Sequence, residues 1–272
     1  MKPVTVRSGK SPIVLAFPHV GTHVPDQIFN QLSAVGKKLS DTDWHVDRLY
    51  DGLLPEATMV VAGFHRYVID ANRDPSGVSL YPGQNTTTLV PTTDFDGQPI
   101  WQEGHEPTKS DIEERRVAFH APYHKALAAE INRVKELHGF AVLYDCHSIR
   151  SEIAYLFDGK LPDFNIGTNG GTTCAPELEA HVLSTCAAAT DYSHVLNGRF
   201  KGGWTTRHYA NPAEDVHVIQ MELAQSTYCM ETDPWDYIDV KAEKLRPVLK
   251  SILVGLEDIA IRKLGPSRTK SR

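Results

Sequence analysis

The sequence predicts an α/β fold, a three-layer αβα sandwich with a mixed, mostly parallel central sheet. First, short apolar runs of strand length alternate along the chain with segments of helical pattern. Second, the 272 residues are 41% hydrophobic, which is enough for one sizeable core. Third, no internal repeat, low-complexity linker or shift in composition marks a second domain. We therefore expect residues 1–272 to form a single domain.

The first half of the chain begins with an apolar run, PIVLAFP, that is typical of a buried strand. Further on, Pro, Gly, Thr and Asp dominate, and such a long loop is uncommon unless it is functional or disordered. The expected elements are a strand at 12–18, a short helix at 25–34, a helix from Ser40 or Asp41 to about Leu54, strand-like pieces at 58–62 and 67–69, and a long loop at about 73–109.

The second half opens with the clearest helical region, residues 110–138. Ser110 followed by Glu113 is a capping-box pattern, Gly139 can end the helix, and Pro122 predicts a break inside it. The later elements are expected to be a strand at 140–144, a helix at 175–189, a short strand at 194–196, a strand at 216–223 and a final helix at 236–260 that is kinked at Pro247.

Composition excludes some functional classes. The net charge of -6 gives no support for nucleic-acid binding, and the basic tail, residues 262–272, is best explained as a solvated end. The longest apolar runs are too short to span a bilayer, so no membrane association is expected. Four cysteines without a CxxC pair, and no apparent signal peptide, predict a cytoplasmic protein. The sequence makes no prediction of oligomeric state.

Polar side chains follow several predicted strands. His19 comes directly after the first strand, His147 follows another in the segment Asp145-Cys-His-Ser148, and Glu222 lies near the end of the strand at 216–223. In open α/β sheets, ligands bind beyond the carboxyl ends of the strands. We therefore expect His19, His147 and Glu222 to share one site.

This set suggests a catalytic metal site, which needs three nitrogen or oxygen ligands and an open position. His19 and His147 supply two, and Asp145 can orient the imidazole of His147. The third ligand is either Asp43 or Asp47, which are one turn apart on the predicted helix and border its apolar stripe. The residues alone leave that choice open, and each histidine, His23 and His45 included, could instead be structural.

Glu222 and two arginines suggest the remaining chemistry. A buried glutamate has a raised pKa, which suits a general base, although a buried ion pair would explain it equally. Arg73 and Arg207 carry guanidinium groups that match carboxylates in a bidentate way, and two of them would suit a substrate with two carboxylates. Alternatively, Arg73 pairs with the nearby Asp70 or Asp74.

Together these segments resemble the N-formylglutamate amidohydrolase family, over roughly residues 10–260 and in consistent order. The segments that carry the resemblance are Pro18-His-Val-Gly-Thr-His-Val-Pro25, Thr42-Asp-Trp-His-Val-Asp-Arg-Leu-Tyr50, Asp70-Ala-Asn-Arg-Asp-Pro75, Asp145-Cys-His-Ser148, Gly202-Gly-Trp-Thr-Thr-Arg-His-Tyr209 and Gln220-Met-Glu-Leu223. A looser similarity extends to zinc carboxypeptidases and aspartoacylase-like enzymes. Those enzymes have a His-x-x-Glu motif, whereas Thr22 stands three residues after His19 here.

The resemblance implies a single catalytic domain that hydrolyses N-formyl-L-glutamate to L-glutamate and formate in histidine degradation. It implies one divalent metal ion, foremost zinc, with manganese, iron or cobalt as alternatives. The implied roles are His19, His147 and Asp47 (or Asp43) as metal ligands, His147 and Glu222 as catalytic residues, and Asn72, Arg73, Arg207 and Tyr209 as residues that bind a small substrate with carboxylates. The competing hypotheses are a deacylase of another acidic acyl amino acid, such as formyl- or acetylaspartate, a peptidase, and a non-catalytic carboxylate-binding module.

Overall fold

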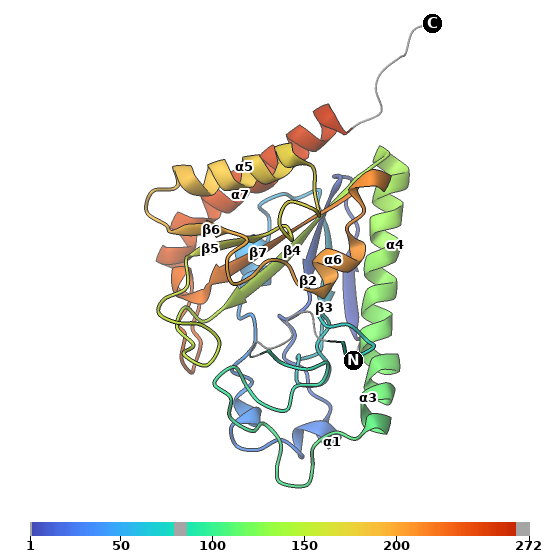
Figure 1. Cartoon of the computed structure of the whole chain (residues 1–272), viewed down its shortest axis with the longest axis vertical. Coiled ribbons are helices and arrows are strands. Elements are labelled where there is room, and N and C mark those ends of the chain that lie inside the picture. Colours follow the sequence, from blue (N-terminus) through green and yellow to red (C-terminus); the bar gives the residue numbers. More distant parts are fainter. Residues whose placement is uncertain (1, 79–85, 265–272) are drawn as a thin grey trace, which may run out of the picture.

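The computed structural model describes residues 2–78 and 86–264, in which a seven-stranded sheet lies between layers of helices (Figure 1). The strand order is β1-β3-β2-β4-β7-β5-β6, and the pairs β3–β2, β2–β4, β4–β7 and β5–β6 are parallel, whereas β1 and β5 run antiparallel to their inner neighbours. The predicted mixed, mostly parallel sheet is confirmed. The strands are β1 (Val4–Arg7), β2 (Ile13–Phe17), β3 (Thr58–Ala62), β4 (Ala141–Ile149), β5 (Phe164–Gly167), β6 (His194–Leu196) and β7 (Val216–Ala224).

Each face of the sheet builds its own core. Along β2, Ile13, Leu15 and Phe17 belong to one apolar cluster, whereas Val14 and Ala16 belong to another. This alternation follows from the two-residue repeat of a strand, and a strand buried on both faces is apolar throughout. The two faces therefore need two helical layers, which is why the fold is a three-layer sandwich.

The helices divide between these faces, with α4 along one side of the sheet and α5 and α7 on the other (Figure 1). A π-helical turn, Arg116–His120, joins α3 to α4 near the predicted break at Pro122. The α-helices are α1 (Asp26–Phe29), α2 (Val46–Tyr50), α3 (Lys109–Arg115), α4 (Ala121–His138), α5 (Pro176–Ala188), α6 (Trp204–Tyr209) and α7 (Asp239–Lys263). Short 3-10 helices lie at Gly36–Lys38, Pro212–Glu214 and Gln225–Thr227.

One face of β4 and β7 changes character along its length. Ala141, Leu143 and Val218 pack in the core under α4, whereas the residues that follow on the same face are polar. Parallel pairing sets Asp145 beside Gln220 and His147 beside Glu222. Residues two apart lie on the same face of a strand. These four polar side chains therefore lie on the same face of the sheet as the apolar residues, past the part that α4 covers. The change marks where the site begins.

The sequence predicts a helix at 40–54, but the helix in the structure is much shorter. His45 has a left-handed backbone (φ 60°), and α2 starts only at Val46. Asp43 therefore lies in the turn before the helix, whereas Asp47 lies in its first turn. The two aspartates do not share one helix face, contrary to the expectation.

Other boundaries also differ. Thr108, not Ser110, caps α3, because its side chain accepts a hydrogen bond from the Asp111 backbone N–H while the Asp111 carboxylate accepts one from Thr108. The strand-like piece at 67–69 is a turn. Residues 86–108 contain only isolated bridges, as expected of a loop. Most of the predicted basic tail lies outside the described residues. No helix within 2–78 and 86–264 has the length and apolar character needed to cross a bilayer.

Candidate metal and catalytic site

Three buried side chains converge near the carboxyl ends of β2 and β4. His19, Asp43 and His147 each offer one atom to a group whose atoms lie within 4.8 Å of one another. Asp43 Oδ2 lies 3.2 Å from His147 Nδ1 and 3.7 Å from His19 Nδ1. His19 Nδ1 is buried and has no hydrogen-bond partner among the described residues. Two nitrogens and one carboxylate oxygen, one of them unpartnered, fit a divalent metal ion such as zinc.

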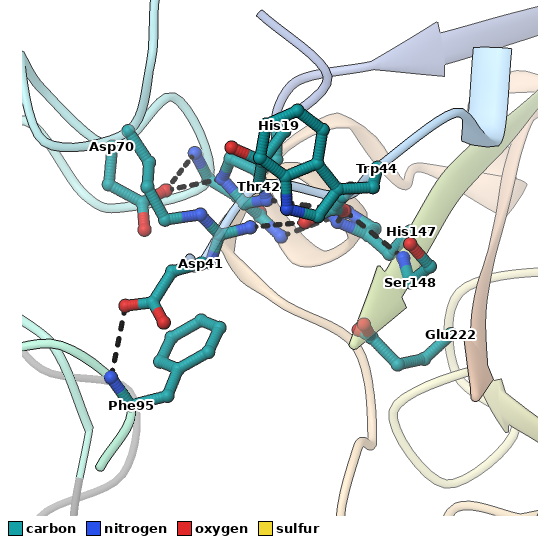
Figure 2. Close-up of polar contacts among 12 residues, drawn as sticks. His19, Asp41, Thr42, Trp44, Asp70, Phe95, His147, Ser148 and Glu222 are labelled. Atoms are coloured by element: carbon teal, nitrogen blue, oxygen red, sulfur yellow. Dashed lines mark hydrogen bonds and ion pairs between the residues drawn. The ribbon is translucent and has the colours of Figure 1, made fainter. Parts of the chain in front are cut away.

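The far nitrogen of each histidine has a carboxylate within ion-pair distance. His19 Nε2 lies 2.7 Å from Asp70 Oδ1 (Figure 2), and His147 Nε2 lies 3.0 Å from Asp145 Oδ2. Metal-binding histidines commonly have such partners, which fix the ring orientation. Asp145 was expected in this role, and the structure adds Asp70. Both Nδ1 atoms are consequently directed toward Asp43.

Asp43 itself is fixed from two sides. Arg66 Nη2 lies 2.5 Å from Asp43 Oδ1, and the Ser148 backbone N–H donates to Oδ2 at 3.1 Å. Arg66 is buried and was not among the predicted site residues, although a basic residue within the largely apolar segment 58–71 is a usable signal. A buried arginine needs a carboxylate partner, and Asp43 supplies it.

Asp47, which the family resemblance implied first as the third ligand, lies elsewhere. It is half-buried in the first turn of α2 and lines a surface groove with Arg7 and Arg48. The left-handed residue His45 separates it from the turn that carries Asp43. The structure therefore brings Asp43, and not Asp47, to the two histidines. His45 is also outside the cluster, because its Nε2 contacts the Trp235 carbonyl.

Glu222 lies beside this cluster. It pairs in register with His147, is 7% exposed, and reaches from β7 toward the end of β4 (Figure 2). Gln220 Nε2 donates to Glu222 Oε2 at 3.3 Å. Glu222, His19 and His147 all line the same pocket, so the grouping expected from the strand ends is present in the structure.

The protonation states of the metal-free site follow from burial and charge. Burial opposes ionisation of Asp43, but Arg66 and His19 more than offset it and hold the pKa of Asp43 well below its usual value. Burial also opposes the charged form of His147, but Asp145 outweighs it and raises the pKa of His147 well above the usual value. Burial raises the pKa of Glu222 to about 8. Asp145 therefore favours the charged form of His147.

Asn72 and Arg73 line the same pocket next to the histidines. Asn72 Nδ2 lies 3.2 Å from His147 Nε2, and Asn72 Oδ1 accepts from the Thr205 backbone N–H at 2.8 Å. Arg73 donates to the Thr87 carbonyl at 2.9 Å, to Thr87 Oγ1 at 2.8 Å and to the Asn72 carbonyl at 3.0 Å. Its guanidinium lies 3.6 Å from Asp70, which is the pairing that the sequence offered as an alternative.

Arg207 and Tyr209 do not line this pocket. Both lie on α6, where Arg207 Nε donates to the Gly202 carbonyl at 3.0 Å. The Tyr209 hydroxyl lies 2.9 Å from His124 Nδ1, whose other nitrogen contacts the Ala71 carbonyl at 2.8 Å. Tyr209 is thus linked through His124 to the segment that carries Asn72.

The pocket contains a further arginine that the sequence reasoning missed. Arg199 lines it from the segment after β6, together with Phe200 and Leu156. Its signal in the sequence is weak, because β6 has only three residues and the motif nearest to it begins at Gly202. With Arg66 and Arg73, Arg199 makes three guanidinium groups in the described pocket lining.

Comparison with known proteins is consistent across sequence and structure. The model of a family described as N-formylglutamate amidohydrolase matches residues 11–229. An N-formylglutamate deformylase of Pseudomonas putida is 44% identical over 94% of this chain and 96% of its own length. One of Pseudomonas aeruginosa is also 44% identical, over 93% and 95%.

Solved structures share the fold. The crystal structure of N-formylglutamate amidohydrolase from Ralstonia eutropha JMP134 superposes with a TM-score of 0.80 at 24% identity, covering 96% of this chain and 99% of that one. The structure of the gene product Atu2144 from Agrobacterium tumefaciens gives a TM-score of 0.72 at 18% identity, covering 95% and 96%.

Proposed function

Because the chain belongs to the N-formylglutamate amidohydrolase family and is therefore a hydrolase of an amide bond, we propose that it hydrolyses N-formyl-L-glutamate to L-glutamate and formate. Its place is then in histidine degradation, and its compartment the cytoplasm. The four cysteines are free and buried, which agrees with a reducing compartment.

The activity is proposed to depend on one divalent metal ion held by His19, Asp43 and His147. Such an ion polarises the carbonyl of an amide and lowers the pKa of a water molecule, and zinc, manganese, iron or cobalt could do so. The observation that carries this proposal is the arrangement of the two histidines, whose inner nitrogens face Asp43 while a carboxylate lies within ion-pair distance of each outer nitrogen.

Glu222 is proposed to move the proton. Its carboxylate form can accept a proton from the attacking water, and the resulting carboxylic acid can donate that proton to the leaving amine of glutamate. The carbon–nitrogen bond of the formamide breaks, the water oxygen remains on formate, and Glu222 returns to its starting state. Burial supports the second step, because it raises the pKa of the carboxyl to about 8.

Arg73 and Asn72 are proposed to orient the substrate. The Arg73 guanidinium is held in place by Thr87 and by the Asn72 carbonyl, so little freedom is lost when it binds a carboxylate. Positioning the formamide between this clamp and Glu222 lowers the barrier by removing the entropy cost of alignment. Because an ammonium group lacks the fork, Arg73→Lys should mainly impair substrate binding.

Formate release from N-formylglutamate tests the proposal directly. The assay uses the purified protein as isolated, after chelation, and after addition of zinc, manganese, iron or cobalt. We expect turnover that is lost with the metal and restored by at least one of the ions. Faster hydrolysis of N-acetylglutamate or N-formylaspartate would overturn the substrate assignment, and full activity in metal-free protein would overturn the metal dependence.

A further inference from the structure

Two of the three pocket arginines, Arg66 and Arg73, lie near the metal-binding residues. Arg66 pairs with Asp43, and its guanidinium lies over the Phe95 ring, 4.9 Å from the centroid. Arg73 is held by Thr87 and lies close to Asp70. Both arginines belong to the segment that follows β3, so they reach the pocket from the β3 side of the sheet.

Arg199 comes from the other side. It follows β6, and the strand order places β3 and β6 on opposite sides of the β4–β7 pair that carries His147 and Glu222. Its Nε donates to the Leu156 carbonyl at 3.2 Å, and its guanidinium lies over the Phe200 ring, 5.5 Å from the centroid. A carbonyl and an aromatic ring thus orient the guanidinium at the pocket wall, where its planar fork can meet an anion.

Apolar side chains surround Arg199 at the pocket wall. Leu156 and Phe200 pack on the small cluster that contains Phe95 and Ile149, and all four residues line the pocket. An aliphatic chain that ends in a carboxylate matches such a wall, because the methylene groups contact the apolar side chains while the terminal anion meets the arginine.

From this arrangement we propose that Arg199 is the specificity-determining residue that binds the side-chain carboxylate of the substrate, while Arg73 holds the α-carboxylate. The assignment rests on the proposed function, since it concerns a formylated amino acid with two carboxylates. In this proposal Arg199 takes the role of second carboxylate clamp in place of Arg207, which is not among the residues that line the pocket. The guanidinium of Arg199 then selects substrates with an acidic side chain over those with a neutral one.

A pair of substrates that differ only at the side-chain terminus isolates this contact. N-formylglutamate and N-formylglutamine share the formamide, the α-carboxylate and the chain length. kcat/KM is measured for both with the natural protein, Arg199→Gln and Arg199→Lys. We expect Arg199→Gln to lower kcat/KM for N-formylglutamate by about 10–100-fold, as for loss of a charged hydrogen bond, and to change that for N-formylglutamine less than threefold. kcat/KM of Arg199→Lys for N-formylglutamate should lie between the values of the natural protein and Arg199→Gln, because lysine keeps the charge without the planar fork.

The matched control is Lys201→Gln, which removes a cation from the same segment. Lys201 is exposed and does not line the pocket, so the preference for N-formylglutamate should be unchanged. A binding measurement completes the set. Calorimetric affinity for L-glutamate relative to L-glutamine should fall in Arg199→Gln by a similar factor, and this measurement does not require turnover.

The outcomes separate the two proposals. If the natural protein hydrolyses N-formylglutamate well but Arg199→Gln keeps its full preference over N-formylglutamine, the assignment of Arg199 is wrong and the proposed function stands. Equal losses for both substrates would also overturn it, because they indicate a contact with a group that both share. If the natural protein hydrolyses neither substrate, the proposed function itself fails. Should Arg199→Gln not fold, the same comparison with Arg199→Lys decides.

Discussion

His147 and Glu222 occupy the same register position on the adjacent parallel strands β4 and β7. Residues paired in this way lie on one face of the sheet, so a candidate metal ligand and the candidate base are set side by side by the backbone ladder. The placement requires no loop, and both side chains are buried. A site built on strands is positioned more rigidly than one built on loops.

Replacing Glu222 by glutamine should separate proton transfer from metal binding. The amide keeps the shape of the side chain but cannot accept the proton, so we expect kcat to fall by about 10²–10⁴-fold. Metal content should stay at the level of the natural protein, since Glu222 is not among the three clustered residues. Formate release and metal analysis measure the two effects. Turnover within tenfold of the natural protein would remove Glu222 from the mechanism.

The activity should also fall at acidic pH, because Glu222 becomes protonated. Burial is the largest cause that raises the pKa of Glu222, and it places this pKa at about 8 in the metal-free protein. The base is the deprotonated form, so it is present above this pKa and is lost as the pH falls through it. A bound cation lowers the pKa and moves the acid limb to lower pH. kcat/KM should therefore fall about tenfold for each pH unit below the pKa of Glu222 in the active protein.

The residual activity of Glu222→Gln provides the control for that profile. Since glutamine does not titrate, the acid limb should be absent or displaced in this variant. An identical limb in both proteins would assign the ionisation to another group.

Two neighbouring aspartates give a matched test of the metal ligands. Asp43→Asn should weaken zinc affinity by at least about 100-fold, because loss of even an outer partner of a metal ligand costs about 10–100-fold. Asp47→Asn should leave the affinity unchanged, since Asp47 lies on α2 away from the histidines. Titration against a competing chelator measures both. The opposite ranking would restore Asp47 as the ligand.

Stability in acid should depend on His124. Burial lowers the pKa of His124 from 6.5 to about 3. The unfolded chain therefore takes up the proton first, so the stabilisation is complete above about pH 6.5 and is lost as the pH falls toward 3. The difference between the pKa of His124 in the unfolded and the folded state corresponds to roughly 3–5 kcal/mol of unfolding free energy. Urea unfolding from pH 7 to pH 4 should show a shallower loss for His124→Gln than for the natural protein, and parallel curves would contradict the assignment.

The strand-borne part of the site could be predicted from the sequence. Short apolar runs mark β2, β4 and β7, and the polar residues at or near their carboxyl ends are visible in the sequence itself. Because parallel strands present these ends at one edge, His19, His147 and Glu222 could be grouped without coordinates. The same reasoning identified the three-layer fold.

The turn-borne part could not be predicted in the same way. The choice between Asp43 and Asp47 depends on the left-handed backbone of His45, and a non-glycine residue in that region has no reliable sequence signal. Arg199 and Arg207 differ in where their segments pack. The three-residue strand β6 and the short helix α6 are set by long-range contacts, such as the hydrogen bond from Gly203 N to Gln220 Oε1.

The strand order has a consequence for how the molecule reaches its active form. The residues that line the pocket come from segments between His19 and Glu222. The β4–β7 ladder also joins parts of the chain that are far apart in sequence. Such long-range pairing is slow to form, and no short fragment contains the complete ligand set with its base. A cation that binds only the assembled site therefore stabilises the native state by mass action, and the stabilising free energy rises with the logarithm of the cation concentration. Under the proposed metal dependence, the concentration of the ion would shift the folding equilibrium as well as the rate.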